Sequence, residues 1–202
     1  MHLKRLVLAV LPAAAVTLAA ACFSDPVYPG NQLLGTFSFE ARLDPSGTTC
    51  DASVSDFAQL DDAGVFRFEG TFSRDADSGT GWVTVQGFSR DAGYEGQQVH
   101  STLTAVAPRA TCGTGCEDSK IEETLKVTLF SDSQARTLNR DCRQHDGGTP
   151  EGTPPAPTEN GYDVSLACGS LKDVFLPGTG SKCNCQPSTC TTAYKIQGER
   201  RN

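Results

Sequence analysis

The chain contains few of the residues from which metal centres and hydrolytic sites are built. Its 202 residues include only three histidines, and no Cys-x-x-Cys, Gly-x-Ser-x-Gly or Ser-x-x-Lys pattern occurs. Zinc sites need clustered His or Cys ligands, and serine hydrolases need a histidine beside the nucleophile. His100 lies in an alternating segment where it is expected to face solvent, and His145 lies in an irregular one. The sequence therefore predicts no catalytic residue, no metal site and no cofactor.

A surplus of basic residues is also missing. The chain has 24 acidic and 17 basic residues, which gives a formal net charge of −7. A nucleic-acid partner is excluded on this ground, because binding phosphates requires a basic stripe. The 20 glycines and 11 prolines indicate many turns. This composition favours an all-β fold over a helical one.

The first 21 residues have the order of an export signal. Lys4 and Arg5 precede the uncharged segment 6–21, which ends in Ala19-Ala20-Ala21. This apolar segment is too short and too rich in alanine for a stable membrane span. Residues 1–21 are therefore interpreted as a signal peptide.

Leu18-Ala19-Ala20-Ala21-Cys22 resembles the lipobox of bacterial lipoproteins. The resemblance implies that Cys22 is lipid-modified and becomes the first residue of the mature protein. The cysteine count agrees, because eight of the nine cysteines then remain, enough for four disulfides in an oxidising compartment. The disulfide candidates are Cys50, Cys112, Cys116, Cys142, Cys168, Cys183, Cys185 and Cys190.

The lipoprotein resemblance also implies a location. Two or three acyl chains on Cys22 would anchor the protein stably in a membrane. By analogy with enteric lipoproteins, Phe23 in the next position points to the outer membrane. Residues 22–32 are then the lipidated cysteine and a tether, and residues 33–202 form a single domain.

Polar and apolar residues alternate in several segments, which is the pattern of a β-strand with one buried face. In 33–43 the apolar positions include Phe37, Phe39 and Ala41. Further strands are predicted at 65–73, 82–89, 97–107 and 121–130, weaker ones at 162–168, 172–176 and 191–197, and helical turns at 131–138. We expect an antiparallel meander that forms a barrel or a sandwich.

Residues 143–161 interrupt this alternation. Gly147-Gly148, Pro150 and Pro154-Pro155-Ala156-Pro157 are incompatible with a helix or a central strand. We expect an exposed Pro/Gly-rich loop here, which is also a candidate contact segment. Four of the eight cysteines precede the loop and four follow it, so two self-contained disulfide sets are compatible with the sequence, and the pairing stays open.

Three acidic patterns are assigned to structure rather than to chemistry. Asp75-x-Asp77 lacks the later ligands of a calcium loop, so a hairpin turn is expected there. In Asp61-Asp62 and Glu122-Glu123, neighbouring side chains would point to opposite faces of an extended strand. Neither pair is therefore expected to act as an acid–base pair.

Asn31-Gln32-Leu33-Leu34-Gly35-Thr36-Phe37 is similar to the first-strand Gly-x-Trp motif of lipocalins, with Phe37 in the position of the tryptophan. The resemblance covers these seven residues, and the later Thr-Asp-Tyr motif of that family is absent. It implies an eight-stranded barrel that carries a small apolar ligand.

Together these observations predict a lipid-anchored protein of the cell envelope with a non-catalytic binding or structural role. The expected partners are the membrane, through the lipid on Cys22, and another envelope protein or a glycan. One alternative is a lipocalin-like carrier. Another is a hydrolase with a dispersed site, which would require His100 within hydrogen-bond reach of a serine and a carboxylate.

Overall fold

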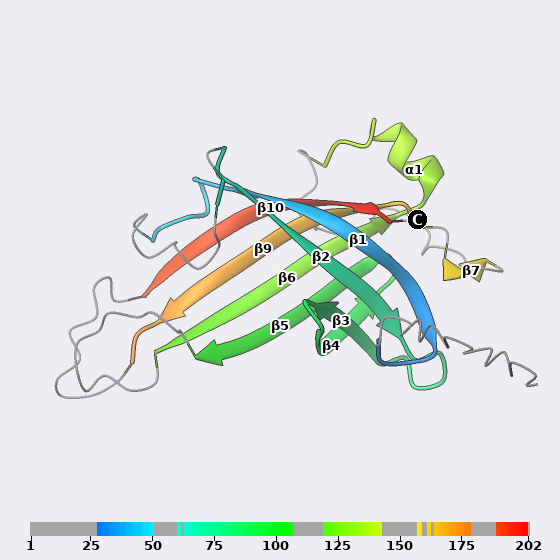
Figure 1. Ribbon diagram of the computed structural model, residues 1–202, viewed down its shortest axis with the longest axis horizontal. Helices are drawn as coiled ribbons and strands as arrows, with labels where there is room; N and C mark the ends of the chain where they lie inside the picture. The colour runs from blue at the N-terminus through cyan, green and yellow to red at the C-terminus, as the bar shows by residue number, and fades with distance from the viewer. Residues whose placement is uncertain are drawn as a thin grey trace, which may run out of the picture.

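Eight antiparallel strands form a closed barrel in the computed structural model (Figure 1). The structure describes residues 28–50, 60–61, 63–106, 119–142, 157–158, 161–162, 164–178 and 189–201. The predicted all-β antiparallel fold is confirmed, and it is a barrel rather than a sandwich. The elements are β1 (Gln32–Leu43), β2 (Val65–Arg74), β3 (Gly81–Val85), β4 (Phe88–Glu95), β5 (Gln98–Val106), β6 (Lys120–Phe130), α1 (Asp132–Thr137), β7 (Pro157–Thr158), β8 (Gly161–Tyr162), β9 (Leu166–Leu176) and β10 (Cys190–Arg200).

The strands follow one another around the barrel in chain order, and β10 closes it against β1. The closing register runs from Phe37 opposite Arg200 to Leu43 opposite Tyr194. We call the end of the barrel where β6 ends and α1 begins the helix end. The opposite end, where β1 ends and β10 begins, is the far end.

Aromatic side chains fill the interior toward the helix end. Phe37, Phe39 and Phe72 are at most 1% exposed, and their ring centroids lie 5.6–6.0 Å apart. The Phe39 ring has room because its partner on β10 is Gly198, where a Cβ would lie 2.5 Å from that ring. Leu125, Val127, Leu129 and Ile196 complete this half of the core.

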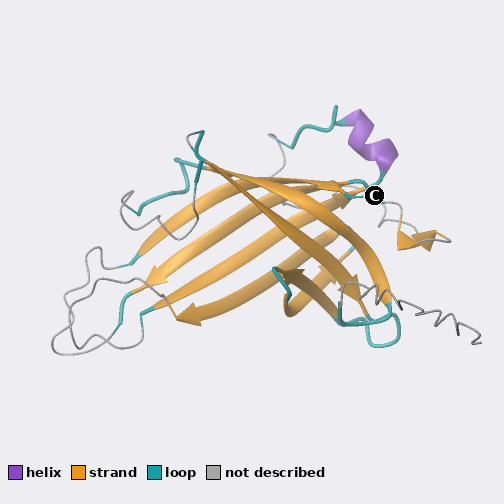
Figure 2. Cartoon of the chain, in the orientation of Figure 1, coloured by secondary structure: helices purple, strands orange, loops and turns teal. Residues whose placement is uncertain are grey.

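A second, smaller core lies on the outer face of β6 and β9 at the helix end. The helix α1 places the fully buried Ala135 against Phe130, Leu166 and the Cys142–Cys168 disulfide. Ser131 begins the helix with a capping box, in which its side chain and that of Gln134 each accept a backbone N–H. The helical turns expected at 131–138 are therefore confirmed (Figure 2).

The strand predicted at 82–89 is wrong, because it is a hairpin of two strands. Gln86 and Gly87 both have positive φ, at 52° and 81°, and form the two-residue turn between β3 and β4. Asp91-Ala92-Gly93, which falls between the strands predicted at 82–89 and 97–107, lies within β4.

The separate strands expected at 162–168 and 172–176 are also wrong, because β9 runs unbroken from Leu166 to Leu176. Gly169 hides this continuity in the sequence. A Cβ there would lie 1.9 Å from the carbonyl oxygen of Lys126 on β6, so the close approach of the two backbones requires glycine.

Two disulfides are described, and both contradict the self-contained sets. Cys50–Cys190 and Cys142–Cys168 each join a cysteine before the Pro/Gly-rich loop to one after it. The first ties the segment after β1 to the start of β10. Cys22, Cys112, Cys116, Cys183 and Cys185 lie outside the described residues.

Most of the loop predicted at 143–161 also lies outside the described residues. Within it the structure places a two-residue strand, β7, antiparallel to β8, with Pro157 opposite Tyr162 and Thr158 opposite Gly161. The loop therefore contains a short paired segment that its composition did not suggest.

We expect the two disulfides to stabilise the protein unequally. They span sequence separations of 140 residues for Cys50–Cys190 and 26 for Cys142–Cys168. Loop-closure entropy then assigns about 5 kcal/mol to the first and about 3.5 kcal/mol to the second. Urea denaturation of the two double Cys→Ala variants under non-reducing conditions should show the larger loss for Cys50/Cys190, and the reverse order would contradict this account.

Candidate functional site

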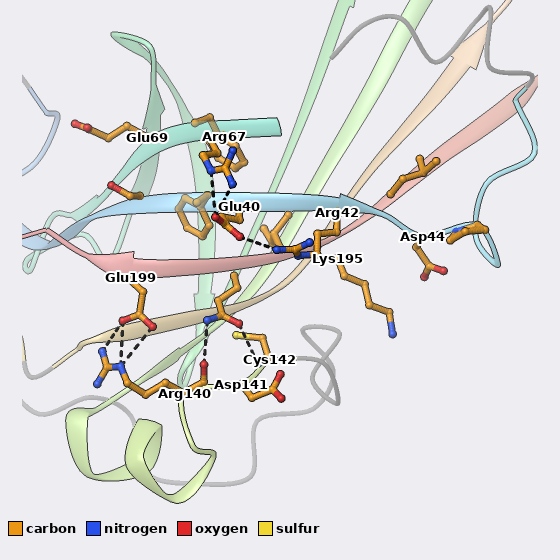
Figure 3. A pocket seen from close by; sticks show the side chains of 17 residues that line it. Glu40, Arg42, Asp44, Arg67, Glu69, Arg140, Asp141, Cys142, Lys195 and Glu199 are labelled. Atoms are coloured by element: carbon orange, nitrogen blue, oxygen red, sulfur yellow. Dashed lines mark hydrogen bonds and ion pairs between the residues drawn. The ribbon is translucent and has the colours of Figure 1, made fainter. Parts of the chain in front are cut away.

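An open groove of about 1330 Å³ lies on the outer face of the barrel. Its floor is formed by outward side chains of β2, β1 and β10, and the segment after α1 lines one side (Figure 3). Charged side chains of both signs line it: Glu40, Arg42, Asp44, Arg67, Glu69, Arg140, Asp141, Lys195 and Glu199.

Many of these charges neutralise one another. Glu40 accepts from Arg67 at 2.9 Å and from Arg42 at 3.0 Å, as Figure 3 shows. The hydrogen bond from Arg67 lowers the pKa of Glu40. Arg140 pairs with Glu199 at 2.5 Å and with Asp132 at 3.1 Å. These pairs give the groove a largely compensated charge.

The barrel wall is incomplete at the far end, between β4 and β5. The ladder between these strands comprises only Gly93–Glu95 opposite Gln98–His100. Beyond it, β5 continues to Val106 paired with β6 alone within the described chain. In Figure 1, β5, β6, β9 and β10 extend well past the short β3–β4 hairpin. Leu103, on the inner face of β5, is consequently 42% exposed.

Three charged residues enter the interior beside this gap. Arg90 shares the inner face of β4, because its partner on β3 is the buried Val83. Its side chain crosses the gap and pairs with Glu123 on β6. Glu123 in turn lies directly opposite Asp173 on β9. Arg90, Glu123 and Asp173 are here called the far-end charge cluster.

The side chains around Asp173 offer it little compensation. Thr192, its partner on β10, is 2% exposed, and the neighbouring inward residues Leu171 and Phe175 are buried. The pKa of Asp173 is raised to about 7, mainly by burial and also by the charge of Glu123, while the charge of Arg90 acts in the opposite direction. The pKa of Tyr194 is raised to about 12, mainly by burial and also by the charge of Asp173.

Two buried polar atoms of the far-end charge cluster lack a hydrogen-bond partner, namely Asp173 Oδ1 and Arg90 Nε. Native proteins leave few buried polar atoms unsatisfied, so such atoms call for an explanation. Among the described residues, those that line the outer groove have no buried polar side-chain atom without a hydrogen-bond partner. We therefore take the far-end charge cluster as the candidate ligand site.

The residues singled out in the sequence are not brought together at this site. His100 is exposed on the outer face of β5, and its neighbours across the ladders are Gly93 and Lys126. Asp75 accepts the N–H groups of Asp77 and Ser78, both at 2.9 Å, which confirms a hairpin turn. His145 lies outside the described chain. No group of three or more metal-ligating side chains occurs within the ranges that the structure describes.

The Glu122 and Glu123 side chains point to opposite faces of β6, as expected. Glu122 is exposed, while Glu123 is in the inward phase with Leu125 and Val127. A charged residue in the inward phase of an alternating strand is a signal of a buried charge, and the prediction did not use it. Asp173 likewise lies two residues from Leu171 and two from Phe175, on the same face of its strand. Glu123 and Asp173 can therefore both be recognised as charged residues on an otherwise apolar face.

No known family, curated protein or solved structure matches this chain in comparisons of sequence and structure. No helix among the described residues is long and apolar enough to cross a membrane.

Replacing Asp173 should change stability in a pH-dependent way. The pKa of Asp173 is about 7 in the folded protein, against an ordinary value of 3.8, so between these values the folded state binds more protons. Stability therefore falls as pH rises through this window. Asp173→Asn, which cannot ionise, should be more stable than the parent at about pH 8, by at most about 4 kcal/mol. The difference should nearly vanish at about pH 4.

Thermal denaturation at both pH values measures this effect. Glu122→Gln is the matched control, because it removes a carboxylate from the exposed face of the neighbouring strand. A variant Asp173→Asn that loses stability at the higher pH would mean that the carboxylate is stabilised rather than strained.

Proposed function

We propose that this protein is a lipid-anchored, non-catalytic binding protein of the bacterial cell envelope, and that it holds a small ligand at the far end of its barrel. The observation that carries the proposal is the far-end charge cluster. It places the unpartnered Asp173 Oδ1 and Arg90 Nε beside the gap between β4 and β5. A ligand that hydrogen-bonds to these atoms would satisfy groups that the barrel itself leaves unsatisfied.

The position of the N-terminal strand is compatible with a lipid anchor at one end of the barrel and a ligand at the other. The first strand begins at Gln32, at the helix end, where Asn31 N–H bonds the Arg74 carbonyl at 3.2 Å. A lipid on Cys22 would therefore hold the barrel by its helix end. The far end, with the charge cluster, would then lie at the opposite end of the barrel from the point of attachment.

A polar ligand fits the interior better than the deep apolar ligand of the lipocalin-like alternative. The aromatic residues Phe37, Phe39 and Phe72 occupy the half of the barrel toward the helix end and are in mutual contact. An apolar ligand would have to displace these rings, because protein interiors are close-packed. The far-end half holds apolar side chains too, such as Phe66 and Phe175, but it also contains the charged groups of Arg90, Glu123 and Asp173.

The anchor is tested with Cys22→Ser expressed in a bacterium with a lipoprotein pathway. We expect the parent to carry acyl chains and fractionate with membranes, and the variant to lose both the acyl mass and the membrane association. Intact mass spectrometry and fractionation measure these two properties. If the variant stays in the membrane fraction, the lipoprotein proposal is wrong.

The ligand is tested by native mass spectrometry of the protein extracted from its own membranes. A discrete mass that is present under native conditions and lost on denaturation, apart from the covalent acyl chains, is the expected result. The same mass should be absent from Asp173→Asn and retained by Glu122→Gln. A native mass equal to that of the lipidated polypeptide would contradict a ligand-holding role.

The second candidate function is docking of an envelope protein or a glycan in the outer groove. Its size and its exposed charged walls favour this candidate. Crosslinking in cells distinguishes the two functions. A crosslink from position 195, in the groove, would support docking, whereas substitutions at position 173 would leave docking unchanged.

A further inference from the structure

The charge balance at the far end indicates the chemistry of the ligand, given the ligand-binding role proposed above. Arg90 and Glu123 form an ion pair, so among the described residues the carboxylate of Asp173 has no cation of its own. The lysines of the three strands around it cannot supply one, because Lys120, Lys126, Lys172 and Lys195 are exposed on the outer face. The described side chains that point into the barrel at this end therefore carry an excess negative charge whenever Asp173 is ionised.

Of the two unpartnered polar atoms of the far-end charge cluster, Arg90 Nε is a donor and Asp173 Oδ1, on the residue opposite Glu123, is an acceptor. Asp173 Oδ1 is buried without a donor, and directly opposite lies Glu123, a second carboxylate. Like charges opposite each other on neighbouring strands destabilise a sheet. A group placed between them must therefore donate hydrogen bonds and carry positive charge in order to relieve both defects.

An organic ammonium meets these requirements better than a metal ion. Divalent cations such as calcium take six to eight oxygen ligands, whereas only two carboxylates meet here, one of them already paired with Arg90. An ammonium group has three donors and no acceptor. Asp173, Glu123 and the buried hydroxyl of Thr192 lie on one inner face of adjacent strands and offer matching acceptors.

Apolar side chains stand next to these acceptors. Phe175 follows Asp173 on the same face, and Leu103 of β5 lies opposite Glu123 at the gap in the wall. The ring of Tyr194 packs edge-on against Phe66, with centroids 5.1 Å apart, on the strand that carries Thr192. An alkyl chain attached to the ammonium could therefore pass the gap beside Leu103.

We propose that the far-end charge cluster binds small organic amines as their ammonium cations, with the ammonium group held between Asp173 and Glu123 and the hydrocarbon part directed toward the gap between β4 and β5. Arg90 has a positioning role, since its ion pair holds Glu123 in place.

The test uses three probes of one length: hexylammonium, 1-hexanol and hexanoate. Each is titrated into the full mature protein by isothermal calorimetry at about pH 8, with the protein first freed of copurifying molecules. We expect hexylammonium to bind at least about tenfold more tightly than hexanol, and hexanoate not to bind. Asp173→Asn should weaken hexylammonium at least about tenfold, and Glu122→Gln should change it less than about twofold.

The pH dependence of the affinity is a second test, because a purely structural role of Asp173 would not make the affinity depend on its ionisation. Asp173 must be ionised to hold the cation, so the affinity for hexylammonium should rise between about pH 5.5 and pH 8. The charged groups that face Asp173 are Glu123 on β6 and Arg90 on β4, and Tyr194 on β10 stays neutral in this range. Hexanol should show no such dependence.

The outcomes separate this inference from the proposed function. If hexanol or hexanoate binds as tightly as hexylammonium and Asp173→Asn abolishes it, the far end binds a ligand but the amine inference is wrong. If no probe binds and native mass spectrometry shows no bound molecule, both are wrong. If hexylammonium binds equally to the parent and to Asp173→Asn, its site lies elsewhere and the inference is again wrong.

Discussion

The closure of β1 against β10 is the constraint on which the rest of the structure depends. It joins the first and last strands of the sheet, far apart in sequence, and it creates an inside and an outside. The seam continues past the end of β1, where the N–H groups of Thr49 and Cys50 bond the Thr191 carbonyl at 2.7 and 3.1 Å. The Cys50–Cys190 disulfide lies on this extension. The strand pairing with the greatest separation in sequence is therefore reinforced by a covalent link.

The fold was largely predictable because most strands show one buried and one exposed face. Phe37, Phe39 and Ala41 are the inward residues that alternation indicated in β1. Prediction failed where a local backbone requirement hides the pattern. Gln86-Gly87 forms a tight turn with positive φ although glutamine is not a usual residue there, and Gly169 interrupts the apolar alternation of β9 for a steric reason.

The candidate site was not predicted, because its three charges come from three strands. Neighbouring carboxylates in the chain, such as Glu122 and Glu123, are visible in the sequence, whereas the two that meet in the structure are Glu123 and Asp173. Their meeting depends on the register between β6 and β9, which no local pattern contains. Arg90 was hidden further, since the strand that carries it was predicted with the wrong bounds.

The two halves of the barrel contribute differently to folding stability. This difference explains how the unfavourable far-end charge cluster can persist. Each fully buried phenylalanine at the helix end contributes about 1.5–3 kcal/mol, and Phe37, Phe39 and Phe72 form one connected cluster. The strain of ionising Asp173 beside Glu123 is at most about 4 kcal/mol. On this scale the burial of the three rings outweighs the cost of ionising Asp173. The outer groove needs no such compensation, because its ion pairs are formed in solvent, where each is worth about 1 kcal/mol or less. A carboxylate without a cation inside the barrel is poorly solvated, so it would gain more from a bound cation than a solvated carboxylate of the outer groove would.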